Sequence, residues 1–302
     1  MHVLAIGECM AEFAPADMAG TYRLGFAGDT FNTAWYLARC ASNIHVSYLT
    51  MVGEDPISTN LRAFMAGSGI DDRFLRTHPD RTIGLYMISL QDGERNFTYW
   101  RGQSAARMLA DDPEYLAQAI DAVDIVYFSG ITLAILSEQA RTTLLSALQN
   151  AREIGKCIVF DPNLRPVLWA SADQMTDVIM KGAAISNIAC PSFEDEATYF
   201  GDRTPHETAK RYLGAGVTTV VVKNGPGPVI YAEGQHFGQA AVRPMEAVTD
   251  TTAAGDSFNA GLLAAHVAGT SLTDAVAYAC QVSRIVVQHK GALVDAPLPT
   301  LM

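Results

Sequence analysis

The chain has 302 residues, 49% of them hydrophobic, which is enough for one large α/β domain or for one domain with a small appendage. Its formal net charge is −11 and it contains no run of Lys or Arg, which excludes a nucleic-acid-binding surface. No apolar run reaches about 18 residues, so no membrane span is expected. The five cysteines form no Cys-x-x-Cys pair, and the amino terminus leads directly into a strand pattern without a signal peptide. We therefore expect a cytoplasmic protein with buried thiols.

Short runs of β-branched residues alternate along the chain with runs of helical period. The predicted strands are Val3–Gly7, Val46–Val52, Ile125–Ser129, Ile158–Asp161, Ile185–Ala189 and Thr219–Lys223. The predicted helices are Phe31–Arg39, Ile57–Ala66, Ser137–Ile154, Ala172–Lys181, Phe193–Phe200, His206–Leu213 and Ser257–Ala268. This alternation predicts a single α/β domain over residues 1–302, with a mostly parallel central sheet and helices on both faces.

Polar residues stand where two of these strands end. Asp161-Pro162-Asn163 follows one strand, and Lys223-Asn224-Gly225 follows another. In open α/β sheets, ligands bind outside the carboxyl ends of the strands. Both segments are therefore candidates for a binding site.

Two segments interrupt the alternation. Residues 9–27 show no helix pattern, and residues 82–101 read as a hairpin whose turn is Gln91-Asp92-Gly93-Glu94. An isolated hairpin is marginally stable in water, so we expect the two segments to form one small sheet that covers the site as a lid. The hairpin has apolar side chains on both faces. We expect one face to cover the ligand and the other to meet a second copy of the chain, giving a homodimer or larger oligomer.

The segment from Asp250 to Gly261 combines a turn, a helix start and one acid. The small residues 253–255 let the backbone approach a ligand closely, and the N–H groups of a helix N-terminus suit a phosphate. Asp256 lies beside that anion site. A carboxylate there would repel a phosphate unless it had a task, and accepting the proton of an attacking hydroxyl is such a task. The alternative is that Asp256 only favours the dipole of a capped helix.

These twelve residues resemble the signature of the ribokinase-like (PfkB) sugar kinases, Asp-Thr-x-Gly-Ala-Gly-Asp-x-Phe-x-x-Gly. The resemblance implies the ribokinase-like fold with its β lid, and ATP and Mg²⁺ as cofactors. It implies that Asp256 is the catalytic base and that Ala253, Ala254 and Gly255 line the anion hole. Ala253 stands where the family usually has Gly, a replacement that costs little if φ is negative there.

A second resemblance lies at Phe26-Ala27-Gly28-Asp29-Thr30-Phe31-Asn32-Thr33-Ala34, near the amino terminus. The family's signature there is Gly-Gly-x-x-x-Asn-x-Ala, and its residues contact sugar hydroxyls. The resemblance assigns Gly28, Asp29 and Asn32 to the sugar, and a carboxylate at 29 can accept two hydroxyl hydrogens. The alternative is that Asp29 is the N-cap of the following helix, with Asn32 pointing inward.

The same segment resembles the branch of this family that phosphorylates 2-keto-3-deoxygluconate. In that branch two lid tyrosines and two arginines hold the acid sugar, which points to Tyr86, Tyr99, Arg101 and Arg165. An Arg fork fits a carboxylate. The alternatives are that Tyr86 is an ordinary strand aromatic, that Arg101 is a rim charge, and that Arg165 contacts ATP phosphates and stabilises the transition state.

The nucleotide contacts follow from a third resemblance. Lys223-Asn224-Gly225-Pro226-Gly227 is similar to the family's Lys-x-Gly-x-x-Gly loop. The implied ATP contacts are Asn163, Lys223, Gly225, Gly227, Ala254, Gly255 and Ser283. The family's Asn-x-x-Glu, which organises Mg²⁺ through water, falls at Ser192 and Asp195, with Glu194 and Glu196 adjacent. The resemblance thus implies Glu194 or Asp195 behind the metal, and the alternative is an acidic first helical turn that favours the dipole.

Taken together, these motifs predict an ATP-dependent phosphotransferase acting on the terminal primary hydroxyl of 2-keto-3-deoxygluconate. One alternative is a kinase for a neutral sugar such as fructose or ribose, which has no need of two arginines for a carboxylate. The other is a sugar or nucleotide sensor without turnover, against which the intact Asp256 segment argues.

Overall fold

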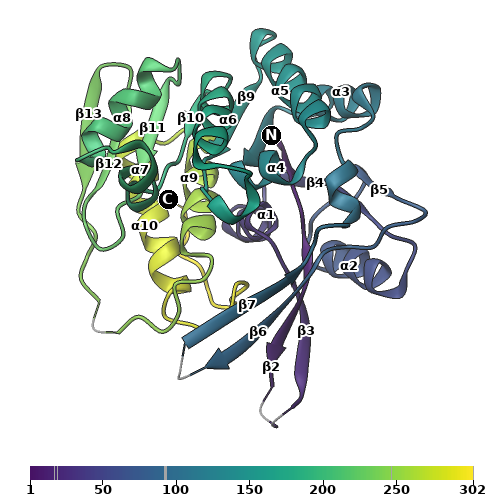
Figure 1. Ribbon diagram of the computed structural model, residues 1–302. Helices are drawn as coiled ribbons and strands as arrows, with labels where there is room; N and C mark the ends of the chain where they lie inside the picture. Colours follow the sequence, from purple (N-terminus) through teal and green to yellow (C-terminus); the bar gives the residue numbers. More distant parts are fainter. Residues whose placement is uncertain (17, 19, 92–93, 246, 302) are drawn as a thin grey trace.

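The computed structural model describes residues 1–16, 18, 20–91, 94–245 and 247–301. In that part of the chain the main body is built on a nine-stranded sheet, in the order β13-β12-β11-β10-β9-β8-β1-β4-β5 (Figure 1). Its strands are β1 (His2–Ile6), β4 (His45–Val52), β5 (Leu75–Thr77), β8 (Ile125–Ser129), β9 (Cys157–Asp161), β10 (Ile188–Ala189), β11 (Thr219–Val222), β12 (Val229–Glu233) and β13 (His236–Ala240). The strands from β11 to β5 in this order pair in parallel, and β12 and β13 extend the sheet antiparallel. The predicted mostly parallel sheet is confirmed.

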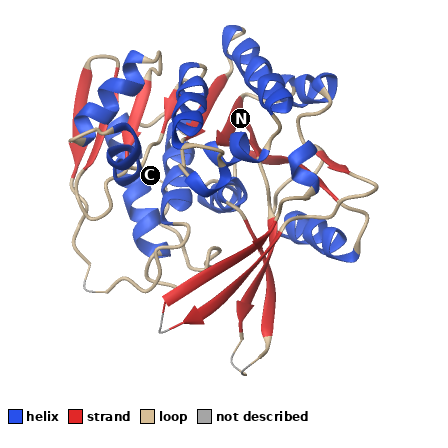
Figure 2. Cartoon of the chain, viewed as in Figure 1, coloured by secondary structure: helices blue, strands red, loops and turns tan. Residues whose placement is uncertain are grey.

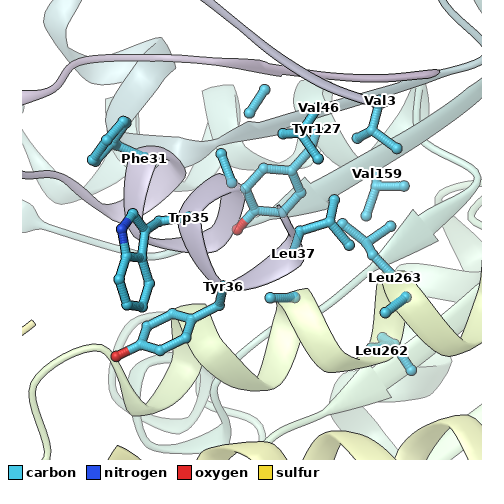
Figure 3. Packing of buried hydrophobic residues seen from close by; sticks show 14 of the residues in the cluster. Val3, Phe31, Trp35, Tyr36, Leu37, Val46, Tyr127, Val159, Leu262 and Leu263 are labelled. Carbon is cyan, nitrogen blue, oxygen red and sulfur yellow. The ribbon is translucent and has the colours of Figure 1, made fainter. Parts of the chain in front are cut away.

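Helices cover both faces of this sheet. They are α1 (Asp29–Cys40), α2 (Pro56–Gly67), α3 (Pro113–Asp121), α4 (Gly130–Ile135), α5 (Glu138–Glu153), α6 (Ala172–Ala184), α7 (Phe193–Phe200), α8 (Pro205–Gly214), α9 (Ala254–Val267) and α10 (Leu272–Val286). Neighbouring residues of β1 point to opposite faces: Val3 packs with α1 and α9 in one buried cluster, which Figure 3 shows, and Leu4 belongs to the other. No described helix is long and apolar enough to cross a membrane.

The predicted elements agree with these bounds to within a few residues, with one clear error. The strand predicted at Ile185–Ala189 is only Ile188–Ala189, because α6 continues to Ala184 and Ile185 is its C-cap. The pattern did not reveal α3, α4, α10, β5 or the β12–β13 hairpin.

The two interrupting segments do form one sheet. Its strands are β2 (Met10–Pro15), β3 (Tyr22–Ala27), β6 (Leu85–Gln91) and β7 (Glu94–Trp100), in the order β3-β2-β6-β7. The link between the segments is the parallel pairing of β2 with β6. The predicted turn residues Asp92 and Gly93 lie outside the described residues. This small sheet projects from the main body, as the strands in Figure 2 show.

Candidate active site

The carboxyl ends of β9 and β11 bring a lysine and an aspartate together. Lys223 follows β11, and its Nζ lies 3.0 Å from Oδ2 of Asp161, the last residue of β9. Asn259 of α9 donates its Nδ2 to the same oxygen at 2.7 Å. The two segments that were site candidates because they stand at strand ends therefore meet at the first turns of α9.

Asp256 lies in the first turn of α9 and faces α1. Its Oδ2 accepts a hydrogen bond from Asn32 Nδ2 at 2.8 Å, and its carbonyl accepts one from Thr33 Oγ1 at 3.2 Å. Burial, together with the nearby charge of Asp29, raises the pKa of Asp256 to about 8. The hydrogen bond from Asn32 acts in the opposite direction and lowers this pKa. A carboxyl group with a pKa in this range is suited to exchange a proton near neutral pH.

The turn before α9 differs from the expectation in one respect. Ala253 is the N-cap of α9 and has a φ of 58°, in the left-handed region. The condition of an ordinary negative φ is therefore not met, and an alanine there costs about 1–2 kcal/mol relative to a relaxed backbone. The left-handed residue stands at the start of the first turn of α9, where the N–H of Ala254 donates to the carbonyl of Thr251 at 3.1 Å. A Cβ on Gly255 would lie 3.4 Å from Lys223 Nζ.

Asp29 is the first residue of α1, and the cap of that helix is Gly28, so Asp29 is not the N-cap. Its Oδ2 accepts a hydrogen bond from Asn163 Nδ2 at 2.9 Å. Burial raises the pKa of Asp29. Gly28 is required here, because a Cβ would clash with the carbonyl oxygen of Glu8. Asp29, Asp161 and Asp256 thus form one acidic group, in which Asp161 is paired with Lys223.

One face of the small sheet turns toward this group. Tyr86 packs with Met10, Ile88 and Ala292, and Ala253 lies against the same cluster. The Tyr86 hydroxyl donates to Glu12, and its ring lies 5.7 Å from that of its cross-strand partner Tyr99, which is half exposed. Arg101, two residues beyond Tyr99, has a side chain only 11% exposed and donates to Glu8.

The three acidic residues after β10, which are Glu194, Asp195 and Glu196, have different surroundings. Glu196 is buried and bonded to Arg211 at 2.6 Å and to Tyr212 at 2.9 Å, in a cluster of its own. Glu194 is exposed. Asp195 has an oxygen 3.9 Å from Arg165 NH1, and Asp161 and Lys223 are among the charges that act on its pKa, which burial raises. Asp195 is therefore the acid that faces the site.

The remaining residues that were predicted to contact the nucleotide lie in two separate segments. Ser283 of α10 donates its Oγ to the carbonyl of Ala254 at 2.9 Å and so ties α10 to the start of α9. Gly225 and Gly227 lie in the turn after Lys223, where Gly225 has a φ of 51°. Among the described residues no cluster of three or more His, Cys, Asp or Glu side chains is suited to hold a metal ion directly.

Three residues of the site were missed by sequence reasoning. They are Glu8, which follows β1, Glu12 on β2, and Asn259 on α9. Glu8 stands at the carboxyl end of a parallel strand, so the rule that identified Asp161 could also have found it. Asn259 lies three residues after Asp256, which places both on the same side of α9.

Known proteins resemble this chain over nearly its whole length. The family model described as pfkB family carbohydrate kinase matches residues 1–300. The chain is 37% identical to the 2-dehydro-3-deoxygluconokinase of Haemophilus influenzae, with 96% of this chain and 94% of the relative covered, and 36% identical to that of Escherichia coli, with 97% and 96% covered. The crystal structure of a PfkB protein from Polaromonas sp. JS666 superimposes with a TM-score of 0.83 at 26% identity, over 99% of this chain and 97% of that chain. The chain belongs to the pfkB family of carbohydrate kinases.

Proposed function

We propose that this chain uses ATP to phosphorylate the terminal primary hydroxyl of 2-keto-3-deoxygluconate, which is 2-dehydro-3-deoxygluconate under its other name. The observation that carries the proposal is the position of Asp256, between Asn32 and the amino end of α9, with its pKa raised to about 8. The relatives named 2-dehydro-3-deoxygluconokinase, at 35–37% identity over nearly the whole chain, support this substrate.

In this proposal Asp256 accepts the proton of the attacking hydroxyl. The N–H groups of residues 253–256 stabilise the charge that develops on the transferred phosphoryl group, because a helix N-terminus favours an anion. Lys223, which now pairs with Asp161, turns to the phosphate and balances its charge. Little covalent work remains, so catalysis is positioning and electrostatics.

ATP occupies the side of Lys223, against Asn163, Gly225, Gly227, Gly255 and Ser283. The carboxylate and carboxamide oxygens of the site fit Mg²⁺, because this ion prefers oxygen ligands and keeps much of its water shell. Asp195 faces the site and would help to hold the hydrated ion, and Glu194 is the weaker candidate because it is exposed. The ion neutralises phosphate charge when bound.

The acid sugar lies between the small sheet and α1. Gly28, Asp29 and Asn32 bind its hydroxyls, and Tyr86 and Tyr99 cover it from the small sheet. Arg101 and Arg165 bind its carboxylate. Arg165 is half exposed, and its ion pair with Asp195 is long at 3.9 Å, so its guanidinium is available to the sugar and to phosphate alike.

One observation favours a second candidate, a kinase for a neutral sugar such as fructose. The charge of Arg101 is already balanced by the buried Glu8, so this arginine does not need a substrate carboxylate to be stable. A substrate panel decides between the two candidates.

The test is ADP release by the purified protein with ATP and Mg²⁺, over a panel of sugars and sugar acids. We expect the highest kcat/KM for 2-keto-3-deoxygluconate. Asp256→Asn is the control and should lower kcat by about 10²–10⁴, the usual contribution of a positioned general base, with little change in the KM for ATP. A panel led by fructose or ribose contradicts the substrate, and no sugar-dependent ADP release at all contradicts the function.

We also infer that the protein is a homodimer or larger oligomer through the small sheet, and that it works in the cytoplasm. Tyr22, Leu24 and Trp100 are exposed on the face turned away from Tyr86, as strand alternation and register require. A second copy of this face would remove the patch from water. All five cysteines are free thiols, which suits a reducing compartment.

A further inference from the structure

Glu8 lies where the small sheet joins the main body. It follows β1 of the large sheet and precedes β2 of the small one, and its side chain is 1% exposed. Its Oε2 accepts a hydrogen bond from NH2 of Arg101, which follows β7 at another junction between the sheets. The ion pair thus links the first and the last of the four connections, which converge at the base of the small sheet in Figure 1.

The other two connections also meet Glu8. Gly28 joins β3 to α1, and a Cβ there would clash with the Glu8 carbonyl oxygen. Gly84 precedes β6, and a Cβ there would lie 2.6 Å from Glu8 Oε1 and 3.2 Å from the Arg101 Cβ. Residue 84 is the next position after the Leu85–Trp100 pair, so it faces Arg101 across the hairpin. Gly84 leaves the room that the Glu8–Arg101 pair occupies, and Gly28 leaves room for the Glu8 backbone.

Within the residues that the structure describes, the Glu8–Arg101 ion pair makes one hydrogen bond, where an Arg fork can make two. In the described part of the chain, Glu8 Oε1 and Arg101 Nε are buried without a hydrogen-bond partner, although the two groups already share the bond from NH2. A buried ion pair with unmatched atoms adds little to stability, since desolvation of both charges offsets their attraction. Its presence at the base of the small sheet therefore calls for a role other than stability.

We propose that Glu8 is a positioning residue for Arg101. It holds the guanidinium on the face of the small sheet that carries Tyr86 and Tyr99, so that Arg101 meets the carboxylate of an acid sugar already oriented. Arg101 lies beside that face, because a Cβ on Gly84, two residues before Tyr86, would lie 3.2 Å from the Arg101 Cβ. This inference rests on the proposed function, which supplies the substrate carboxylate.

The test is a double-mutant cycle on the KM for 2-keto-3-deoxygluconate. Glu8→Gln keeps the shape and removes the charge, and we expect it to raise this KM about tenfold or more, with the KM for ATP within about twofold of the parent. Introduced into Arg101→Gln, the same change should have almost no further effect, because Glu8 acts through Arg101. An unchanged or lower KM in Glu8→Gln, an equal rise in both KM values, or additive effects would overturn the inference.

The double variant and one further variant guard against loss of folding. Glu8→Gln leaves the Arg101 charge buried without its partner, whereas the double variant removes both charges and should unfold at a higher urea concentration than the single variant. If Glu8→Gln does not fold, Gly84→Ala displaces Glu8 Oε1 at constant charge and should raise the KM for the acid sugar alone. The parent decides the proposed function separately: a parent that prefers a neutral sugar refutes both, and a parent that prefers the acid sugar while the variants keep its KM refutes only the role of Glu8.

Discussion

Asp256→Asn should stabilise the protein at neutral and alkaline pH while it removes catalysis. The carboxyl of Asp256 has a pKa of about 8 in the folded chain, against an ordinary value of 3.8. The folded state therefore binds this proton more tightly than the unfolded state, and the associated stability is complete below about pH 4 and lost as the pH rises toward 8. Asparagine has no such proton and can still accept the hydrogen bond from Asn32.

The size of the effect follows from the same values. Between 3.8 and pH 7 there are about three pKa units, each of about 1.4 kcal/mol, which sets an upper limit of about 4 kcal/mol. Asp256 is not fully withdrawn from solvent, and screening reduces that limit. We expect a gain of about 2 kcal/mol at pH 7 and almost none at pH 4.

The assay is urea unfolding of the parent and Asp256→Asn at pH 4, 6 and 8. Asp173→Asn is the matched control, because Asp173 is an exposed acid in the first turn of α6. The difference from the parent should grow with pH for residue 256 and stay small for residue 173. A loss of stability at pH 8, or a gain that does not depend on pH, would refute the electrostatic account of Asp256.

Four further outcomes are expected. The kcat/KM of the parent should rise with pH and level off above about pH 8, because the base must be ionised; a profile that falls over this range would exclude Asp256 as the base. Ala253→Gly should raise the free energy of unfolding by up to about 1 kcal/mol, since it relieves the left-handed φ, whereas Ala254→Gly at the first helical position should lower it by a similar amount. Arg101→Lys should weaken binding of the acid sugar by about 1.5–3 kcal/mol, read from its KM, because a point charge replaces a fork. Sedimentation at micromolar protein should show at least a dimer that Trp100→Glu dissociates; a fully active monomeric parent would rule out pairing through the small sheet.

The sequence was sufficient where a signal is local. Strand runs and the polar residues at strand ends were enough to name the segments at Asp161 and Lys223 as site candidates, and the turn and helix start at 253–256 were enough to place Asp256 beside an anion site. Short elements with weak patterns were lost, such as the β12–β13 hairpin and α4.

What could not be predicted depends on distant contacts or on backbone shape. The partner of Arg101 is Glu8, 93 residues away, and nothing in either local sequence indicates the pairing. The left-handed φ of Ala253 is set by the turn into α9, and an alanine gives no sign of it. Likewise the sequence does not distinguish Glu196 from Asp195 as the acid of the site. In the structure Glu196 is hydrogen-bonded to Arg211 and Tyr212 and does not face the site.

The central claim is tested most directly by competition. The purified protein is given equimolar 2-keto-3-deoxygluconate and fructose with limiting ATP and Mg²⁺, and the two sugar phosphates are quantified by mass spectrometry. The ratio of products equals the ratio of the two kcat/KM values, and a carboxylate held by a charged fork is worth about tenfold or more in that ratio. The account predicts that the phosphate of 2-keto-3-deoxygluconate predominates, on its terminal hydroxyl; a predominance of fructose phosphate would contradict it.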